Sequence, residues 1–171
     1  MSSSSQSMPP SVAPLFSTLW QEAQNLHFDW QIYRQLFGTS QERLTLLARF
    51  GVRAFALFEY VLSHHVTLSI FRLLDPANQG RDKDNLSLER LVNEVKADHP
   101  PLGDTLEQHL HAMRGVMARH ADLRNKVIAH RDLRITPTLY DGTSTVLRPS
   151  RRTVEDALGH LRRIMNGVEV H

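Results

Sequence analysis

The stretch TSQERLTLLARFGVRAFALFEYVLSHHVTLSIFRLL, residues 39–74, decides the fold class of this chain. Its apolar side chains recur at alternating steps of three and four residues, a spacing that places them on one face of an α-helix. The members of this stripe are Leu44, Leu47, Gly51, Ala54, Phe58, Val61, His65 and Leu68. Thr39 at the N-cap and Glu42 three residues later form a capping box, and Pro76 ends the helix. We expect this helix to be the buried centre of the fold.

Four further segments have the same helical periodicity. They cover residues 16–37, 88–95, 104–133 and 153–168. Gly38 ends the first of them, and Asp104 is expected to cap the third. Amphipathic helices joined by short loops predict an all-α fold, an antiparallel bundle of four to five main helices.

Two segments are not expected to be helical. Residues 1–12 are rich in serine and proline, which predicts a disordered polar tail before a single helical domain over residues 13–171. The segment 135–150 is poor in helix-forming residues. Its Asp141-Gly142 pair suits the turn of a small hairpin, and a plain loop explains the segment equally well.

The composition excludes several classes of protein. With no cysteine among its 171 residues, the chain has no disulfide scaffold, thiolate metal site or cysteine nucleophile, and a reducing compartment is favoured. No apolar run reaches the roughly 20 residues of a membrane span, and the first residues lack the layout of a signal peptide. We therefore expect a cytoplasmic protein with no membrane partner.

Positive charge is concentrated in the last third of the chain. Residues 112–171 carry eleven basic and six acidic side chains, whereas the remainder carries nine basic and twelve acidic ones. The net charge of +2 therefore hides a balance of +5 in one part of the chain. Such a distribution fits a surface that binds anions or nucleic acid, and it also fits an ordinary solvated helix face.

The apolar stripe of the fourth predicted helix turns cationic in its second half. After Met117 the same steps lead to His120, Arg124 and Arg131. A core stripe that becomes charged breaks the binary pattern, and such breaks concentrate at functional sites and interfaces. The structural alternative is that Arg124 pairs with a carboxylate from another helix and that His130 caps the helix end.

The segment RNKVIAH, which begins at Arg124, resembles the signature of the HEPN superfamily, in which an arginine, a polar residue and a later histidine lie near the end of a core helix. The polar residue here is Asn125, and five residues separate the arginine from His130. RLLDPANQGRDKDNLSLERL, residues 72–91, followed by RNKVIAHRD, is similar to the abortive-infection AbiU-like branch of that superfamily. The resemblance covers roughly residues 16–168.

This resemblance implies a helical bundle that dimerises about the motif helices, so that two copies of the motif face a shared cleft. Many members of the superfamily are metal-independent endoribonucleases, typically toxins of toxin–antitoxin systems or effectors of phage defence. Other members have lost activity and bind nucleic acid, a nucleotide or a protein partner. The resemblance therefore predicts a homodimeric ribonuclease and leaves a non-catalytic dimer as the alternative.

The residues expected to be catalytic are Arg124, Asn125 and His130, and their chemistry suits RNA cleavage without a metal or a cofactor. A histidine titrates near neutral pH, so that His130 can serve as base or acid. The guanidinium of Arg124 can brace a phosphate with two hydrogen bonds, and Asn125 can hydrogen-bond the phosphate or orient His130. The expected products carry a 2′,3′-cyclic phosphate and a 5′-hydroxyl. Four further cations are expected to hold the RNA backbone: Arg119, Lys126, Arg131 and Arg134.

One position departs from the pattern of the superfamily. Some HEPN toxins carry a tyrosine two residues after the histidine, and a partner nucleotidyltransferase modifies it. This chain has Asp132 at that position. We therefore expect any antitoxin to act by another route.

The ten histidines do not predict a metal site. His64 and His65 are adjacent, and His109 and His111 are two residues apart. On a helix the side chains of each pair point in different directions, unlike the i, i+4 pairs that chelate zinc. His65 lies on the apolar stripe, which predicts a core histidine.

Overall fold

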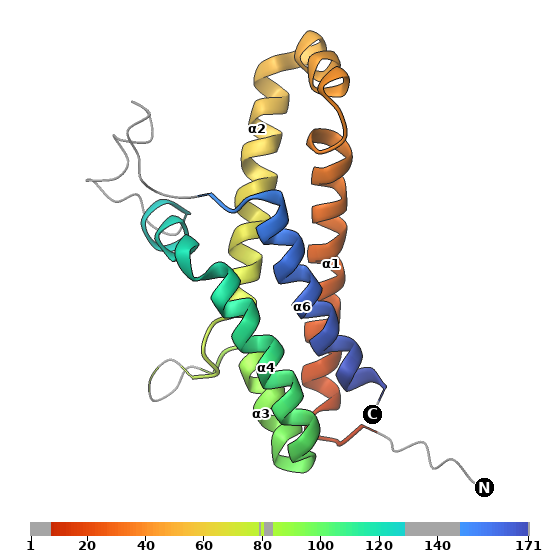
Figure 1. The fold of residues 1–171 in the computed structure, drawn as a ribbon, viewed down its shortest axis with the longest axis vertical. Helices are drawn as coiled ribbons and strands as arrows, with labels where there is room; N and C mark the ends of the chain where they lie inside the picture. The colour runs from red at the N-terminus through yellow and green to blue at the C-terminus, as the bar shows by residue number, and fades with distance from the viewer. Residues whose placement is uncertain (1–7, 79, 81–83, 129–147, 171) are drawn as a thin grey trace, which may run out of the picture. The chain divides into compact units, whose positions relative to one another are not determined.

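The structure is a computed structural model that describes residues 8–78, 80, 84–128 and 148–170, and for residues 126–128 the backbone alone. Every regular element within these residues is helical (Figure 1). The elements are α1 (Ala13–Phe37), α2 (Gln41–Leu73), α3 (Leu88–Asp98), α4 (Pro100–Met117), the 3₁₀ turn η1 (Ala118–His120), the π-helix η2 (Leu123–Ile128) and α6 (Arg151–Glu169). The prediction of an all-α fold is confirmed.

The two segments predicted to be non-helical lie mostly outside the described residues. Of the predicted tail, residues 8–12 are described, and Val12 is buried. Of the predicted hairpin or loop at 135–150, residues 148–150 are described, and they lead directly into α6. Both predictions therefore stay predictions.

The helices belong to two compact units. The first unit comprises Met1–Ala23, Phe71–Arg119 and Pro149–His171, and it contains α3, α4 and α6. The second unit comprises Gln24–Ile70 and His120–Arg148, and it contains the second half of α1, nearly all of α2, and η2. The prediction of a single helical domain stays a prediction.

The core of the first unit lies between α4 and its two neighbours, α3 and α6, which both pack against it. The apolar side chains of these helices recur every three or four residues, as the sequence predicts. The largest fully buried ones are Leu88, Leu91, Leu106, Met113, Met117, Leu161, Ile164 and Met165. At about 1.5–3 kcal/mol for each such side chain, their burial is the main contribution to the stability of this unit.

α3 and α4 approach each other closely at Gly103. A methyl group at this position would collide with the backbone and the Cβ of Lys96 in α3. The Nζ of Lys96 forms ion pairs with Glu107 (2.7 Å) and Asp104 (2.9 Å) of α4. The hydrogen bonds to Glu107 and Asp104 raise the pKa of Lys96. The two helices are thus joined by a glycine contact and by a charged contact beside it.

The start of α4 differs from its prediction. The capping role predicted for Asp104 is wrong, because α4 begins at Pro100 with His99 at its N-cap. Proline is tolerated in the first turn of a helix, where the N–H has no acceptor within the helix. The carboxylates of Asp104 and Glu107 are engaged by Lys96 instead.

Serine side chains cap three of the helices. The Oγ of Ser87 accepts a hydrogen bond from the backbone of α3, and the Oγ of Ser150 does the same for α6. At the start of α2, the Oγ of Ser40 accepts from the N–H of Arg43 (3.2 Å). The predicted N-cap at Thr39 is therefore one residue early.

Glu89, in the first turn of α3, joins three segments of the first unit. One of its carboxylate oxygens accepts a hydrogen bond from the backbone N–H of Ala77 (2.7 Å), and the other accepts from Arg114 of α4 (3.1 Å). Arg114 also donates to the carbonyl oxygen of Leu74 (3.3 Å). The hydrogen bond from Ala77 lowers the pKa of Glu89, and the hydrogen bond and charge of Arg114 lower it further against the opposing effect of burial.

α2 departs most from its prediction, which made it the buried centre of the fold. Only its C-terminal end is well buried, with Val66 and Ile70 at 1% and 0% exposure. Phe50 and Phe58 are 80% and 50% exposed. The helix is kinked at Gly51, whose φ of 173° and ψ of 71° are not helical. The prediction is wrong because the apolar residues of α2 occupy more than one face, and the described chain covers only part of them.

By length and composition, α2 is also the one helix within the described ranges that could cross a membrane. Only 17% of its most apolar window is buried within the protein. A single weakly apolar helix of this kind is weak evidence for a membrane protein.

The contact at Gly103 predicts a stability difference between two glycines of α4. Gly103→Ala is expected to lower the free energy of unfolding by about 1–3 kcal/mol, because the added methyl group meets backbone atoms that cannot move aside. Gly115→Ala is the matched control, since no atom lies within 4 Å of its added Cβ, and it is expected to raise stability by about 0.5–1 kcal/mol. Urea unfolding of both variants measures the difference, and equal effects would contradict the close approach.

The carboxylate of Glu89 predicts a dependence of stability on pH. Because its pKa is lower in the folded chain than the ordinary value of 4.5, its contribution is present above about pH 4.5 and is lost as the pH falls through the folded value. At pH 7 we expect Glu89→Gln to be less stable than the wild type by about 1–2 kcal/mol, and this gap to close in acid. Thermal unfolding from pH 7 to pH 3 measures it. Glu94→Gln, in the same helix, should show no such gap at pH 7.

Candidate functional site

The motif segment follows α4 and changes its helical type twice. α4 ends at Met117, the turn η1 (Ala118–His120) is 3₁₀, and η2 (Leu123–Ile128) is a π-helix. The prediction of one continuous helix from 104 to 133 is therefore wrong between Met117 and Ile128, and its last residues, 129–133, lie outside the described part of the chain. π-helical turns inside helical segments are rare and occur often at functional sites.

The change in helical type decides which side chain of the motif segment is buried. A continuous α-helix from Met117 would turn Arg124 toward the core, because the two residues are seven apart. In the structure Leu123 is buried, at 3% exposure, and Arg124 is half-buried. His120, within the irregular stretch, is 2% exposed. The irregular turns thus place an apolar residue where regular winding would place a cation.

Arg124 and Asn125 contact each other directly. Nη1 of Arg124 donates a hydrogen bond to Oδ1 of Asn125 (2.9 Å), and the Asn125 side chain is exposed. The amide therefore orients the guanidinium. The sequence predicts two roles for Asn125, a hydrogen bond to the phosphate and the orientation of His130. The structure adds a third role, the positioning of Arg124.

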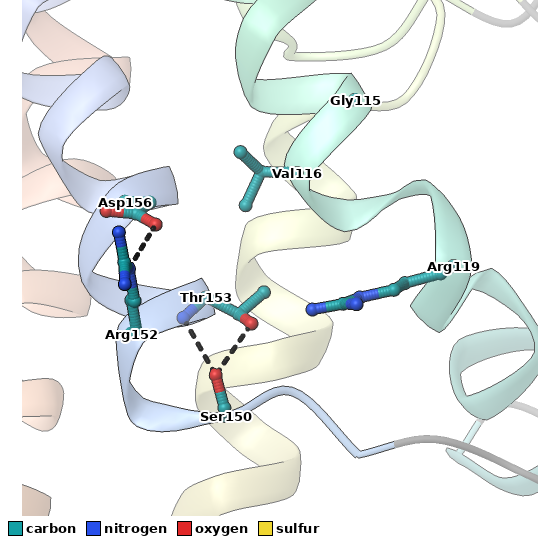
Figure 2. A pocket seen from close by; sticks show the side chains of 7 residues that line it. All are labelled: Gly115, Val116, Arg119, Ser150, Arg152, Thr153 and Asp156. Carbon is teal, nitrogen blue, oxygen red and sulfur yellow. Dashed lines mark hydrogen bonds and ion pairs between the residues drawn. The ribbon is translucent and has the colours of Figure 1, made fainter.

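Arg119 belongs to the first unit, where it lines an open pocket of about 350 Å³ at the start of α6 (Figure 2). Figure 2 shows its side chain extending toward Ser150 and Thr153. The other lining residues are Gly115, Val116, Arg152 and Asp156.

The charges of this pocket are mixed. Arg119 and Arg152 are cationic, and the N-terminus of α6 favours a negative charge. Asp156 opposes them and pairs with Arg152, with 3.8 Å between Oδ2 and Nε. Ser150 already accepts from the N–H of Thr153 (3.1 Å). An anion at this position would meet Arg119 on one side and the first turn of α6 on the other.

The remaining predicted site residues are not placed by the structure. His130, Arg131 and Arg134 lie outside the described residues, as does Asp132. Lys126 lies in η2, and its side chain is not described. The structure therefore brings together Arg124 and Asn125 and shows Arg119 in a separate pocket.

Two histidines of α2 belong to the same compact unit as Arg124. Nδ1 of His64 donates to the carbonyl oxygen of Tyr60 (2.7 Å), and burial lowers the pKa of His64, with the charge of Arg148 as a further cause. The prediction of a core histidine at position 65 is wrong, because 54% of the His65 side chain is exposed. Its Nε2 lies 3.0 Å from Oδ2 of Asp29 in α1.

Sequence reasoning missed the pair of Asp29 and His65, since no spacing along the chain relates two residues on different helices.

A third histidine, His160 of α6, lies near His109 of α4, with 5.6 Å between the ring centres. Burial lowers the pKa of His160, and the charges of Arg163 and His109 lower it further. Within the described part of the chain, no group of three or more His, Asp or Glu side chains could hold a metal ion.

Comparison with known proteins identifies the family of the chain. The model of the HEPN family AbiU2 matches residues 10–171, which is almost the whole sequence. No curated protein and no solved structure matches. The match agrees with the predicted superfamily and with the all-α fold. This chain therefore belongs to the AbiU2 family of HEPN proteins.

Proposed function

We propose that this chain is a metal-independent endoribonuclease of the HEPN type, whose active site forms in a cleft between two copies. The observation that carries the proposal is the contact between Arg124 and Asn125 in the π-helix. It orients a guanidinium that lies six positions before the motif histidine in the sequence. A fixed guanidinium and a nearby imidazole are the groups that a phosphate transfer within RNA requires.

The chemistry is an internal transfer at a phosphodiester of RNA. One His130 acts as base and removes the proton of the 2′-hydroxyl, whose oxygen forms a bond to phosphorus. The bond from phosphorus to the 5′-oxygen breaks, and the His130 of the second copy supplies a proton to that oxygen. Arg124 stabilises the charge on the phosphoryl oxygens, with Asn125 holding its plane. The products are a 2′,3′-cyclic phosphate and a 5′-hydroxyl, and no cofactor takes part.

The surrounding cations bind the RNA chain. Lys126 and Arg131 adjoin the catalytic residues in sequence, and Arg134 follows three residues after Arg131. Arg119 and the start of α6 supply a further contact to backbone phosphate, in the pocket of Figure 2. The balance of +5 over residues 112–171 supports an anionic substrate.

The biological role that fits this activity is a toxin or an effector of phage defence in the cytoplasm. The AbiU2 family places the chain in the context of abortive infection. An antitoxin protein is the expected partner of such a toxin. Because Asp132 stands where a modifiable tyrosine occurs in some HEPN toxins, the antitoxin would act by binding.

A second function is a non-catalytic HEPN dimer that binds nucleic acid, a nucleotide or a protein. The observation that favours it is the pocket at Arg119, which could hold a phosphate group and has no histidine among its lining residues. This alternative predicts binding without cleavage and little effect of His130→Ala on affinity.

The central test is cleavage of a labelled RNA of mixed sequence in EDTA. The wild type is expected to produce cyclic-phosphate ends, and His130→Ala to be slower by a factor of about 10²–10⁴, because its general base and acid are gone. His111→Ala is the matched control, since His111 is an exposed histidine of α4 outside the motif. Absence of cleavage by the wild type, with intact RNA binding, would favour the non-catalytic dimer.

Arg124→Lys separates charge from geometry. The lysine keeps the positive charge and loses both the planar fork and the hydrogen bond to Asn125. We expect cleavage to fall by a factor of about 10–100, whereas the affinity for RNA changes little. Fluorescence anisotropy and single-turnover cleavage measure the two quantities. An equal loss in both would mean that Arg124 only binds the backbone.

The salt dependence of RNA binding tests the role of Arg119. Each phosphate contact adds about 0.7 to the slope of log K against log salt for a single strand, so Arg119→Ala should lower the slope by about that amount. Arg72→Ala, a cation at the end of α2, is the control and should leave the slope unchanged. An unchanged slope for Arg119→Ala would remove the pocket from the RNA path.

A further inference from the structure

The outer face of α2 is largely apolar, and within the described residues it is exposed at Ala54, Leu57 and Val61 and half-buried at His64 and Leu68. Beyond the kink at Gly51, one line of residues recurs at alternating steps of three and four, the spacing of the a and d positions in paired helices. We call this line the outer seam, and it consists of Ala54, Leu57, Val61, His64 and Leu68. Leu57 and Val61 are 57% and 51% exposed, and the other three are exposed or half-exposed.

α2 contacts α1 at His65 and Glu59. Nε2 of His65, which follows Val61 by four residues, lies 3.0 Å from Asp29 at the edge of the seam. Tyr33 of α1 donates a hydrogen bond to Glu59 of α2 (3.4 Å), and both residues belong to the second unit. Glu59 follows Leu57 by two residues, which places the two side chains about 200° apart around the helix. The outer seam therefore points away from the contact with α1 at Glu59. A helix with apolar residues on all sides is normally covered on all sides.

We infer that the outer seam of α2 pairs with the outer seam of a second copy of this chain. The α1–α2 pairs of the two copies then form one helical bundle. This inference rests on the dimer in the proposed function and names the surface through which that dimer forms. The resemblance alone implies contact about the motif helices, and α2 is not one of them.

The exposed area of this face matches the apolar part of a stable interface. The five large side chains on or beside the seam are 46–80% exposed: Phe50, Leu57, Phe58, Tyr60 and Val61. At roughly 150–250 Å² for a whole aromatic side chain and somewhat less for an aliphatic one, they expose about 500 Å². A standard interface buries about 800 Å² on each partner, of which roughly 60% is apolar. The face is therefore large enough for a second copy.

The charges beside the seam favour a protein over a lipid surface. Arg49 and Arg53 are exposed residues of the same stretch of α2. Inside a membrane they would have to leave water, which is unfavourable for each of them. At the rim of an interface between proteins they stay solvated.

Pairing through α2 also suits the position of the motif. Residues Gln24–Ile70 and His120–Arg148 form one compact unit, so the outer seam and the motif segment belong to the same part of the molecule. Two copies joined through this unit have both copies of Arg124 and Asn125 in the joined half of the dimer.

The first test introduces charge into the seam. We expect the wild type to sediment as a dimer at micromolar concentration and the double variant Leu57→Arg/Val61→Arg to associate at least about 100-fold more weakly. Val170→Arg is the matched control, since Val170 is 82% exposed in the first unit, and it should remain dimeric. Circular dichroism shows whether the double variant keeps its helices. A helical double variant that remains dimeric, or a wild type that is monomeric, would overturn the inference.

The second test uses the absence of cysteine from the chain. A single thiol introduced by Val61→Cys should be joined to that of a second copy by a short bismaleimide cross-linker, whereas one introduced by Val170→Cys should not. This variant keeps an uncharged side chain in the seam, so that folding is not at risk. Equal cross-linking of the two variants would overturn the inference. So would flotation of the wild type with phosphatidylcholine–phosphatidylglycerol vesicles that Leu57→Arg/Val61→Arg abolishes.

Dimerisation and cleavage are measured separately, so the two proposals can fail separately. A wild type that dimerises through the seam and leaves RNA intact would remove the proposed activity and keep the interface. A wild type that cleaves RNA, with a helical double variant that is still dimeric, would remove the interface and keep the activity.

Discussion

The hydrogen bonds of Glu89 are the constraint on which the first unit depends. The carboxylate lies in the first turn of α3, where the helix dipole favours a negative charge. It receives the N–H of Ala77 and the guanidinium of Arg114, and Arg114 reaches on to the carbonyl of Leu74. One acid thus fixes the chain leaving α2, the start of α3 and the last turn of α4. Since α4 leads directly to η1, these bonds also set where Arg119 stands in the first unit.

The fold could be predicted where burial alone decides it. α3 and α6 have one apolar face each, and the period of that face fixed their existence and their buried residues correctly. Helix ends depend on local alternatives that periodicity does not rank. Asp104 has the pattern of a cap, yet Pro100 begins α4 earlier, and the carboxylate of Asp104 binds Lys96 from the neighbouring helix instead. Such a choice requires knowledge of which helix lies beside it.

The sequence predicts which residues belong to the candidate site. It does not predict how these residues are arranged in space. Arg124 stands out because it breaks an apolar stripe, and Asn125 because it follows Arg124 in the segment that carries the resemblance. The sequence prediction assigns one uniform α-helical period to the whole stripe. The 3₁₀ and π turns between Met117 and Ile128 change that period, so that Leu123 is buried in place of Arg124. Full burial of a guanidinium is costly, and with this winding Arg124 is half-buried and donates a hydrogen bond to Asn125.

α2 shows why an apolar pattern does not by itself identify the core. Its sequence predicts burial, and burial within one chain is only one way to cover apolar surface. Leu57 and Val61 recur with a helical period as regular as that of any core residue, yet both are more than half exposed. An apolar pattern on one face of a helix indicates burial within the fold of the chain. A second apolar face on the same helix indicates a contact with a molecule outside that fold. If that face is covered by a second copy, the helix that most strongly indicates the fold class of the chain also determines its assembly.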